Sequence, residues 1–250
     1  MKTIFLGMGK MGVPMAMHLQ QNPQILDLKV FDPDLDRLSF ARESGLRVSE
    51  DLALDLSKAQ LVFSSLPHDE ALLSVARQVF EHVNQGTVFI DTSTVSVRAS
   101  AQVNALLADK GVAYLRVTVS GNNHMAQAGQ LTLMASGPQA AWQRVAPMLH
   151  RWGSVQFYLG AGEQARLMKL VINLMIAQTS AMLAEALSLG HKGGLAWRDL
   201  WQVIGASAVA SPIVKAKSVQ LSERDFTPTF TVPQMLKDID LILAEGDALQ

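Results

Sequence analysis

The sequence predicts an α/β fold in which a mostly parallel sheet is followed by a second, all-helical domain. Over residues 1–160, short apolar runs alternate with helical segments, as in parallel sheets with crossover helices. From residue 160 onward we find only helical patterns. We therefore expect domains at 1–160 and 161–250, with the change at Leu159-Gly160-Ala161-Gly162.

The elements of the first domain follow one another in regular alternation. We expect strands at Thr3–Leu6, Leu28–Phe31, Leu46–Val48, Gln60–Ser65, Thr87–Asp91, Ala113–Val119 and Gln130–Ser136. We expect helices at Val13–Gln20, Leu35–Ser44, Asp51–Lys58, from Asp69 onward, Val97–Asp109 and Pro138–His150. Strands separated by helices predict a sheet that is covered on both faces.

The first strand runs directly into Gly7-Met8-Gly9-Lys10-Met11-Gly12, and a helix follows. G-x-G-x-x-G in this context is the fingerprint of a Rossmann-type, dinucleotide-binding domain. The first glycine permits a tight turn, the second lets the backbone approach a pyrophosphate, and the third lets the helix pack closely. The amides at the helix start then hold the phosphates. The alternative is a flexible strand-to-helix turn that binds nothing.

Asp32 ends the second strand, twenty positions after Gly12. A carboxylate at this distance suits the ribose 2′-hydroxyl of NAD, whereas an arginine suits the 2′-phosphate of NADP. Arg37 is close in sequence, so NADP stays open as the less favoured cofactor. We expect NAD.

Composition excludes several classes of function. Hydrophobic residues make up 49% and charged residues 17% of the chain, with a formal net charge of −1. This balance gives no electrostatic reason to expect nucleic acid or a membrane as partner. The absence of cysteine excludes disulfides and thiolate chemistry, and the six histidines lack ligand spacing, so we expect no metal. A strand starting at residue 3 leaves no room for a leader peptide and predicts a cytoplasmic protein.

The segment Leu167–Leu189 is apolar for about the length of a membrane-spanning helix. It also contains Lys169, Asn173, Gln178 and Glu185. We predict instead a buried central helix of a soluble protein, because such a helix is apolar on nearly every side.

Polar or small residues follow three of the expected strands. They are Leu66-Pro67, Asp91-Thr92-Ser93-Thr94 and Ser120-Gly121-Asn122-Asn123, and the carboxyl ends of parallel strands are where such sheets bind ligands. Each has a simpler alternative. Pro67 can merely end a strand, Thr94 can cap the next helix, and the Ser120 segment can be an ordinary loop.

Lys169 and Asn173 are four residues apart and so share one face of the apolar helix. A buried ammonium is costly unless it pairs, lines a cavity or extends to water. The spacing alone leaves open whether Lys169 lines a cavity or reaches solvent near the helix start.

Four motifs occur in order across residues 1–245. They are Leu6–Ala16; Val119-Ser120-Gly121 with Ala126, Gly129 and Leu131-Thr132; Gly160 with Lys169–Asn173; and Phe226-x-Pro228-x-Phe230 with Lys237-Asp238. In this order they resemble the dinucleotide, substrate, catalytic and C-terminal cofactor segments of the β-hydroxyacid dehydrogenases, the 3-hydroxyisobutyrate dehydrogenase-like family. The resemblance implies an NAD-dependent oxidoreductase that transfers hydride between NAD(H) and a small β-hydroxyacid or its semialdehyde.

The resemblance also implies roles for single residues. Lys169 would be the general acid in reduction and the base in oxidation. Asn173 would bind the substrate or hold Lys169, and Ser120 with the backbone at Gly121 and Asn122 would cradle the substrate carboxylate.

On the cofactor side, the resemblance assigns the pyrophosphate to the glycine fingerprint and the ribose to Asp32. Leu66, Pro67 and Thr94 would flank the nicotinamide. Lys237 would reach the cofactor from the helical domain.

Two features depart from the family. Arg116-Val117-Thr118-Val119-Ser120-Gly121-Asn122 stands where Asp-Ala-Pro-Val-Ser-Gly-Gly is usual. Arg116 would favour a substrate with a second acidic group, unless it is simply a solvent-facing strand residue. Relatives also continue for a further pair of helices, so we expect a helical domain shortened at its C-terminus, or a fragment. Because that domain supplies much of the family's dimer interface, we expect a homo-oligomer, a dimer or a tetramer.

Two rival functions remain. An imine reductase would share the fold and the glycine signature, although that group generally lacks the lysine at position 169. A non-catalytic NAD-binding module would bind NADH without lysine-dependent turnover.

Overall fold

The computed structural model describes residues 1–250. The chain divides into two compact units, Met1–Leu170 with Glu245–Gln250, and Val171–Ala244. The division falls inside one long helix.

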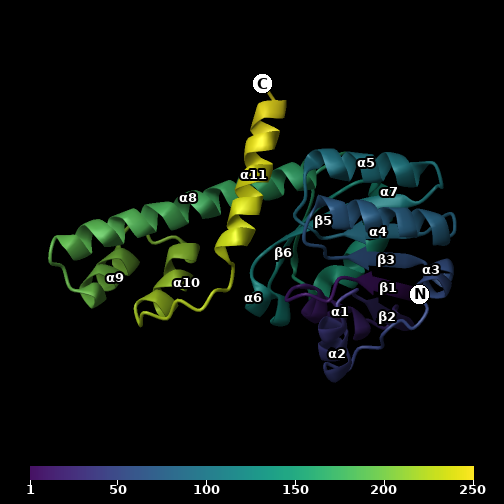
Figure 1. Cartoon of the computed structure of the whole chain (residues 1–250), viewed down its shortest axis with the longest axis horizontal. Coiled ribbons are helices and arrows are strands. Elements are labelled where there is room, and N and C mark those ends of the chain that lie inside the picture. The colour runs from purple at the N-terminus through teal and green to yellow at the C-terminus, as the bar shows by residue number, and fades with distance from the viewer. The chain divides into compact units, whose positions relative to one another are not determined.

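The first unit is built on a seven-stranded sheet of order β2-β1-β3-β4-β5-β6-β7 (Figure 1). The strands are β1 Lys2–Leu6, β2 Asp27–Phe31, β3 Leu61–Ser64, β4 Val88–Asp91, β5 Ala113–Ser120, β6 Thr132–Ser136 and β7 Val155–Tyr158. All neighbouring pairs are parallel except β5 and β6, which run antiparallel. The predicted mostly parallel sheet is therefore confirmed.

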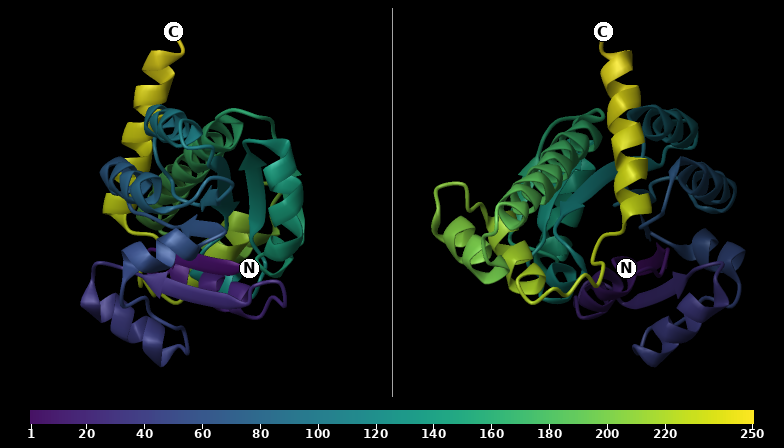
Figure 2. Two further views of the ribbon diagram at one scale, coloured as in Figure 1. Left: turned by 90° about the vertical axis from the view of Figure 1, so that its right-hand side faces the viewer. Right: turned by 60° about the vertical axis from the view of Figure 1, so that its left-hand side comes forward.

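Helices cover both faces of this sheet, as Figures 1 and 2 show. They are α1 Gly12–Gln20, α2 Leu35–Glu43, α3 Leu52–Lys58, α4 Asp69–His82, α5 Val97–Ala108, α6 Asn123–Gln127, α7 Gln139–Val145 and the 3-10 helix η1 Ala146–Arg151. One core contains side chains of α1, α2, α6, α7 and η1. The other core contains side chains of α3, α4 and α5.

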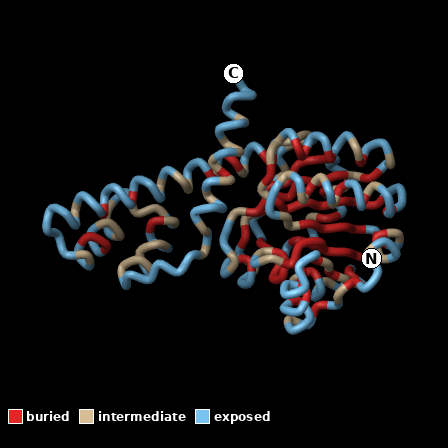
Figure 3. The backbone as a smooth tube through the Cα atoms, in the orientation of Figure 1, coloured by how far each residue is buried: buried red, intermediate tan, exposed pale blue.

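The central strands are apolar without interruption because the helices bury both of their faces. Every residue of β3 and β4 is buried, and Figure 3 shows the sheet as the buried centre of this unit. Polar side chains begin several of the covering helices. Asp34, Asp51 and Ser96 each accept a hydrogen bond from a backbone amide in the first turn of α2, α3 and α5, which is the usual role of an N-cap.

Three local predictions differ from the structure. Leu46–Val48 is not a strand, because only the single bridge between Val30 and Val48 forms there. The edge strand β7 was not predicted, since its exposed and half-buried residues alternate over only four positions. The short helix α6 was also not predicted; it is one turn and a half long and depends on its cap, Asn122.

The second unit is all-helical, as predicted. It contains most of α8 Gln164–Lys192, together with α9 Trp197–Ala206, α10 Pro212–Leu221 and most of α11 Val232–Ala248. Leu183 and Leu187 of α8 pack with Leu200 and Trp201 of α9 and with Val214 of α10 in a small separate core.

Helix α8 is not the buried central helix that its composition predicts. Only 22% of the most apolar 18-residue window of α8 is buried. This window has a mean hydropathy of 1.5, so by length and composition alone α8 is able to cross a membrane. Met168, Met175, Met182 and Leu189 are 40%, 67%, 48% and 77% exposed. Apolar composition does not distinguish a helix surrounded by core from one with an uncovered apolar face, and α8 is the latter (Figure 3).

Candidate active site

The strand order places a topological switch point at β1. Its neighbours are β2 on one side and β3 on the other, and doubly wound sheets bind ligands at the carboxyl ends of the strands at such a point. Gly7 lies at this point with φ +96°, and a Cβ there would lie 2.2 Å from the Ser65 carbonyl oxygen. Only glycine fits.

Of the other two fingerprint glycines, Gly12 has the packing role that the sequence predicts, and Gly9 leaves the backbone open as the predicted pyrophosphate contact requires. A Cβ on Gly12 would lie 1.9 Å from the Gly7 carbonyl oxygen, so close packing of α1 requires glycine. A Cβ on Gly9 would meet nothing within 4 Å, and no side chain caps the start of α1. An open backbone beside helix-terminal amides is what a pyrophosphate needs, so this loop fits a dinucleotide.

Asp32 directly follows β2 and lies at the same edge of the sheet. It is 2% exposed, and its carboxylate accepts hydrogen bonds from the amides of Met8 at 2.7 Å and Asp34 at 3.0 Å. Arg37 Nη1 lies 3.6 Å from Asp32 Oδ2, with half of the arginine side chain exposed. The carboxylate is therefore fixed against the glycine loop, as a ribose ligand must be, and it has a cation beside it.

The two loops expected to flank the nicotinamide are joined to each other. The amide of Leu66 donates to Ser93 Oγ at 2.8 Å, and the amide of Thr92 donates to the Ser64 carbonyl, also at 2.8 Å. The cap of α5 is Ser96, so the alternative that Thr94 caps this helix is wrong.

Lys169 lies half-buried against the expected substrate segment. Its Nζ donates to the Val119 carbonyl oxygen at 2.8 Å, directly before Ser120. Gly121 has φ +137°, and a Cβ there would lie 2.6 Å from the Leu131 side chain. Asn122 uses its side chain to cap α6 at the Met125 amide, at 3.0 Å. Lys169 therefore points back to the end of β5 rather than only into solvent.

The predicted residues of the second unit form their own polar group. Asn173 Nδ2 donates to Asp238 Oδ2 at 2.6 Å, and Lys237 Nζ lies 2.7 Å from Asp238 Oδ1. Asp238 is 2% exposed. The carboxamide of Asn173, one helical turn beyond Lys169, thus joins α8 to α11, which the sequence did not predict.

Both predictions for Arg116 are wrong. The residue is 1% exposed, so it neither faces solvent nor presents its charge to a substrate. Its guanidinium pairs with Glu163, with Nε 3.1 Å from Oε2, and lies 4.4 Å from the centre of the Tyr114 ring. Its positive charge is already compensated inside the protein.

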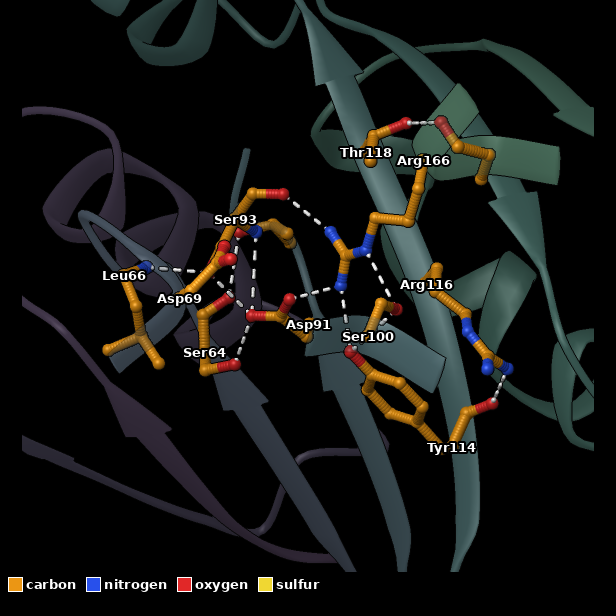
Figure 4. Close-up of polar contacts among 12 residues, drawn as sticks. Ser64, Leu66, Asp69, Asp91, Ser93, Ser100, Tyr114, Arg116, Thr118 and Arg166 are labelled. Atoms are coloured by element: carbon orange, nitrogen blue, oxygen red, sulfur yellow. Dashed lines mark hydrogen bonds and ion pairs between the residues drawn. The ribbon is translucent and has the colours of Figure 1, made fainter. Parts of the chain in front are cut away.

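Arg166 is the principal residue that the sequence reasoning missed. Its side chain is fully buried and pairs with Asp91 Oδ2. It also donates to Tyr114 Oη at 2.8 Å, Ser100 Oγ at 3.2 Å and the Ser93 carbonyl at 2.5 Å (Figure 4). Burial raises the pKa of Tyr114 to about 12, so its hydroxyl stays neutral at ordinary pH. Burial works to lower the pKa of Arg166, but the oxygens of Tyr114 and Asp91 outweigh it and raise this pKa further.

Family comparisons agree with this geometry over the whole chain. Residues 2–160 match the NAD binding domain of 6-phosphogluconate dehydrogenase, and residues 160–250 match the NAD-binding domain of NADP-dependent 3-hydroxyisobutyrate dehydrogenase. Glyoxylate/succinic semialdehyde reductase 1 of Arabidopsis thaliana is 30% identical over 250 residues, which are 99% of this chain and 86% of the reductase. The chain belongs to the β-hydroxyacid dehydrogenase family.

Solved structures extend this similarity. The 3-hydroxyisobutyrate dehydrogenase of Mycobacterium tuberculosis, determined with L-serine, is 28% identical with a TM-score of 0.87, over 100% of this chain and 88% of that one. An imine reductase from Pseudomonas sp. has a TM-score of 0.70 at 16% identity, over 89% of this chain and 78% of that one. At that identity it shares the fold alone.

Membership of the β-hydroxyacid dehydrogenase family confirms the predicted enzyme class and its nicotinamide cofactor. The chain is an NAD-dependent oxidoreductase of the β-hydroxyacid dehydrogenase type. Asp32 is the residue that would favour NAD, and Arg37 beside it is the residue that would meet the 2′-phosphate of NADP.

Proposed function

We propose that this dehydrogenase reduces small carboxylate-bearing aldehydes, or oxidises the matching β-hydroxyacids, with Lys169 as the group that moves the proton. The hydrogen bond from Lys169 Nζ to the Val119 carbonyl carries this proposal. It holds an ammonium group at the end of β5, beside the loop that begins with Ser120. A proton donor in this position is what carbonyl reduction requires.

The bound nicotinamide supplies or accepts the hydride, and the protein holds it in place. Gly7–Gly12 and the start of α1 bind the pyrophosphate, and Asp32 binds the ribose hydroxyls. Leu66-Pro67 and Thr94 flank the ring, and Lys237 contacts the cofactor from α11. The link from the Leu66 amide to Ser93 Oγ supports this arrangement, because it fixes the spacing of the two flanking loops.

Lys169 acts on the substrate oxygen. In reduction its ammonium would donate a proton to the alkoxide oxygen that forms when the carbonyl carbon accepts hydride. In oxidation its neutral amine accepts the hydroxyl proton. The Val119 carbonyl can only accept a hydrogen bond, so it orients Nζ in both directions of the reaction without competing for the proton.

The substrate carboxylate belongs at the loop after β5. The Ser120 hydroxyl and the backbone amides of Gly121 and Asn122 are donors of the kind that bind an oxyanion. The positive φ of Gly121 turns this backbone at the strand end. The Arabidopsis relative is named for glyoxylate and succinic semialdehyde. Both are small molecules that carry one aldehyde group and one carboxylate.

Lys169 also decides between this proposal and its rivals. An imine reductase shares the fold but generally lacks the lysine, and a non-catalytic module would have no use for an ammonium held at a strand end. Both rivals predict that removal of the amine leaves the behaviour of the protein toward semialdehydes unchanged.

We further propose that the protein is a homo-oligomer in which a second copy covers α8. Met168, Met175, Met182 and Leu189 recur every seven residues and are exposed. Residues spaced by seven drift by only about 20° around a helix from one to the next, so these four form a continuous stripe. An uncovered stripe of this kind marks an interaction surface.

The test of the proposed reaction is NADH oxidation with a panel of small semialdehydes and 2-keto acids, for wild type and Lys169→Ala. We expect turnover of at least one carboxylate-bearing aldehyde by wild type. We expect it to fall by about 10²–10⁴-fold in the variant, the usual contribution of a general acid. NADH affinity should be retained. NADH binding without turnover of any substrate by wild type would instead favour the binding module.

A further inference from the structure

The N-terminal turn of α8, the helix that carries Lys169, is tied to the sheet by buried polar contacts. The Ala165 amide donates to Ser136 Oγ at 3.1 Å, and Thr118 Oγ1 donates to the Ala165 carbonyl at 3.0 Å. Arg166, the next residue, pairs with Asp91 at the end of β4, and both side chains are 0% exposed. These contacts therefore fix the position of this turn against the strands β4, β5 and β6.

Asp91 connects the same turn to the loops expected at the cofactor. Its Oδ2 pairs with Arg166, while its Oδ1 accepts from Ser64 Oγ at 2.5 Å and Ser93 Oγ at 2.6 Å. Ser93 Oγ in turn accepts from the Leu66 amide at 2.8 Å. One carboxylate thus joins the end of β3, the loop after β4 and the start of α8, as the dashed lines in Figure 4 show.

We propose that the buried Asp91–Arg166 pair is a positioning device that fixes Lys169 relative to the two nicotinamide-flanking loops. Arg166 lies three residues before Lys169, within one turn of the same rigid helix. Because the guanidinium anchors this turn of α8 to the sheet, loss of the anchor lets the turn move, and the backbone of Lys169 moves with it. This inference rests on the proposed function for its catalytic consequence, but the mechanical link itself does not depend on it.

The chemistry of the pair suits positioning better than it suits stabilisation. A buried ion pair is often no more stabilising than apolar side chains of the same volume. Its benefit is directional, because a planar guanidinium with several fixed donors allows one orientation. Arg166 donates to four different partners, so the helix cannot rotate or slide without breaking several bonds at once.

The matched control is the ion pair between Lys29 and Asp55. It joins β2 to α3, with Nζ and Oδ1 2.7 Å apart, and Asp55 also accepts from Ser49. None of these contacts involves the loops after β3 and β4 or the start of α8. Loss of this pair removes an ion pair from the same unit without touching the proposed device.

The test uses the double variant Asp91→Asn with Arg166→Gln, which leaves no unpaired buried charge, together with Ser93→Ala and Arg166→Lys. The control is Lys29→Gln with Asp55→Asn. Each protein is checked for folding by circular dichroism. Amide hydrogen exchange is then measured for peptides containing Leu66 and for peptides covering residues 163–170. NADH affinity, kcat, KM and the isotope effect with 4-deuterated NADH are measured on the same samples.

We expect the double variant to exchange about 10-fold faster at Leu66 and at the start of α8 together, because both lose one shared anchor. We expect kcat of the double variant to fall by about 10–100-fold, as misplacement by a fraction of an ångström produces. KM and NADH affinity should change by less than about threefold. The deuterium isotope effect should rise because hydride transfer becomes slower. Arg166→Lys should have a kcat between those of the double variant and wild type. The control variant, Lys29→Gln with Asp55→Asn, should change neither the exchange of these peptides nor kcat.

Two results would overturn the inference. Exchange that stays at wild-type rates in either segment of the folded double variant would show that no mechanical link exists. A kcat within twofold of wild type, with exchange altered, would show that the link does not position Lys169. If wild type itself turns over no aldehyde, the proposed function and the catalytic half of this inference both fail, and the exchange data still decide the link.

Discussion

At the scale of single residues, Asp32, the proposed ribose ligand, is a buried carboxylate that the fold itself holds in place. It accepts two backbone amides and stays almost fully buried, so its position is fixed before any ligand arrives. Such preorganisation means that little is lost in ordering the group on binding.

Asp32→Ala should therefore weaken NAD binding by about 10–100-fold, the effect of losing a charged hydrogen bond. Titration of NADH fluorescence measures this. Asp27→Ala is the control, because Asp27 lies at the opposite end of β2 and pairs only with Arg47. An unchanged dissociation constant for Asp32→Ala would show that this carboxylate does not hold the ribose.

Arg116 gives a second prediction at this scale, because its charge is compensated only by Glu163. Glu163→Gln leaves a buried guanidinium without its counter-ion and should lower the free energy of unfolding by about 3 kcal/mol. Asp27→Asn, which removes a surface partner of Arg47, should cost less than about 1 kcal/mol. Urea unfolding of both variants makes the comparison, and equal effects would contradict the assignment.

At the scale of elements, the attachment of α3 to β2 depends on pH. Burial works to raise the pKa of Asp55, but hydrogen bonds from Lys29 and Ser49 outweigh it and hold this pKa below the ordinary value of 3.8. The stabilisation is therefore complete above pH 3.8 and is lost as pH falls through the lower folded-state pKa. Asp55→Asn should be less stable than wild type by about 1 kcal/mol at neutral pH. Unfolding curves at descending pH should converge below that range, and a constant difference would contradict the account.

The apolar stripe of α8 leads to a prediction about assembly. Met175→Glu or Met182→Glu places a charge on the exposed seven-residue repeat and should shift the protein toward monomer in sedimentation velocity experiments. Ala184→Glu introduces the same charge on the opposite side of the helix and should leave the assembly unchanged. A monomeric wild-type protein, or equal effects of both substitutions, would contradict the proposed homo-oligomer.

At the scale of the whole molecule, the parts that the sequence predicted are those with local signals. The glycine fingerprint, Asp32 and the alternation of strands and helices are each contained in a short stretch, so spacing alone reveals them. The edge strand β7 lacked such a signal, because its pattern of exposed and half-buried residues resembles a loop.

The sequence did not predict the partners of Arg116 and Arg166 or how much of α8 is buried. Arg116 finds its partner 47 residues away, and Arg166 finds Asp91 at a separation of 75 residues, so no local pattern reports either pair. The exposed face of α8 was predicted to be buried because hydrophobicity gives the same signal for a helix inside a core and for a helix with an uncovered apolar face. Both errors concern contacts between distant parts of the chain, formed by Arg116 and absent along α8, which composition and periodicity do not contain.

The measurement that most directly tests the central claim, proton transfer by Lys169, is chemical rescue of Lys169→Ala by small primary amines. The account predicts that kcat for semialdehyde reduction falls with NADH affinity retained, and that added ethylamine restores part of it as its protonated form supplies the missing acid. Lys169→Met, which fills the space of the side chain, should be rescued far less. A kcat in Lys169→Ala within threefold of wild type, with no response to amine, would contradict the account.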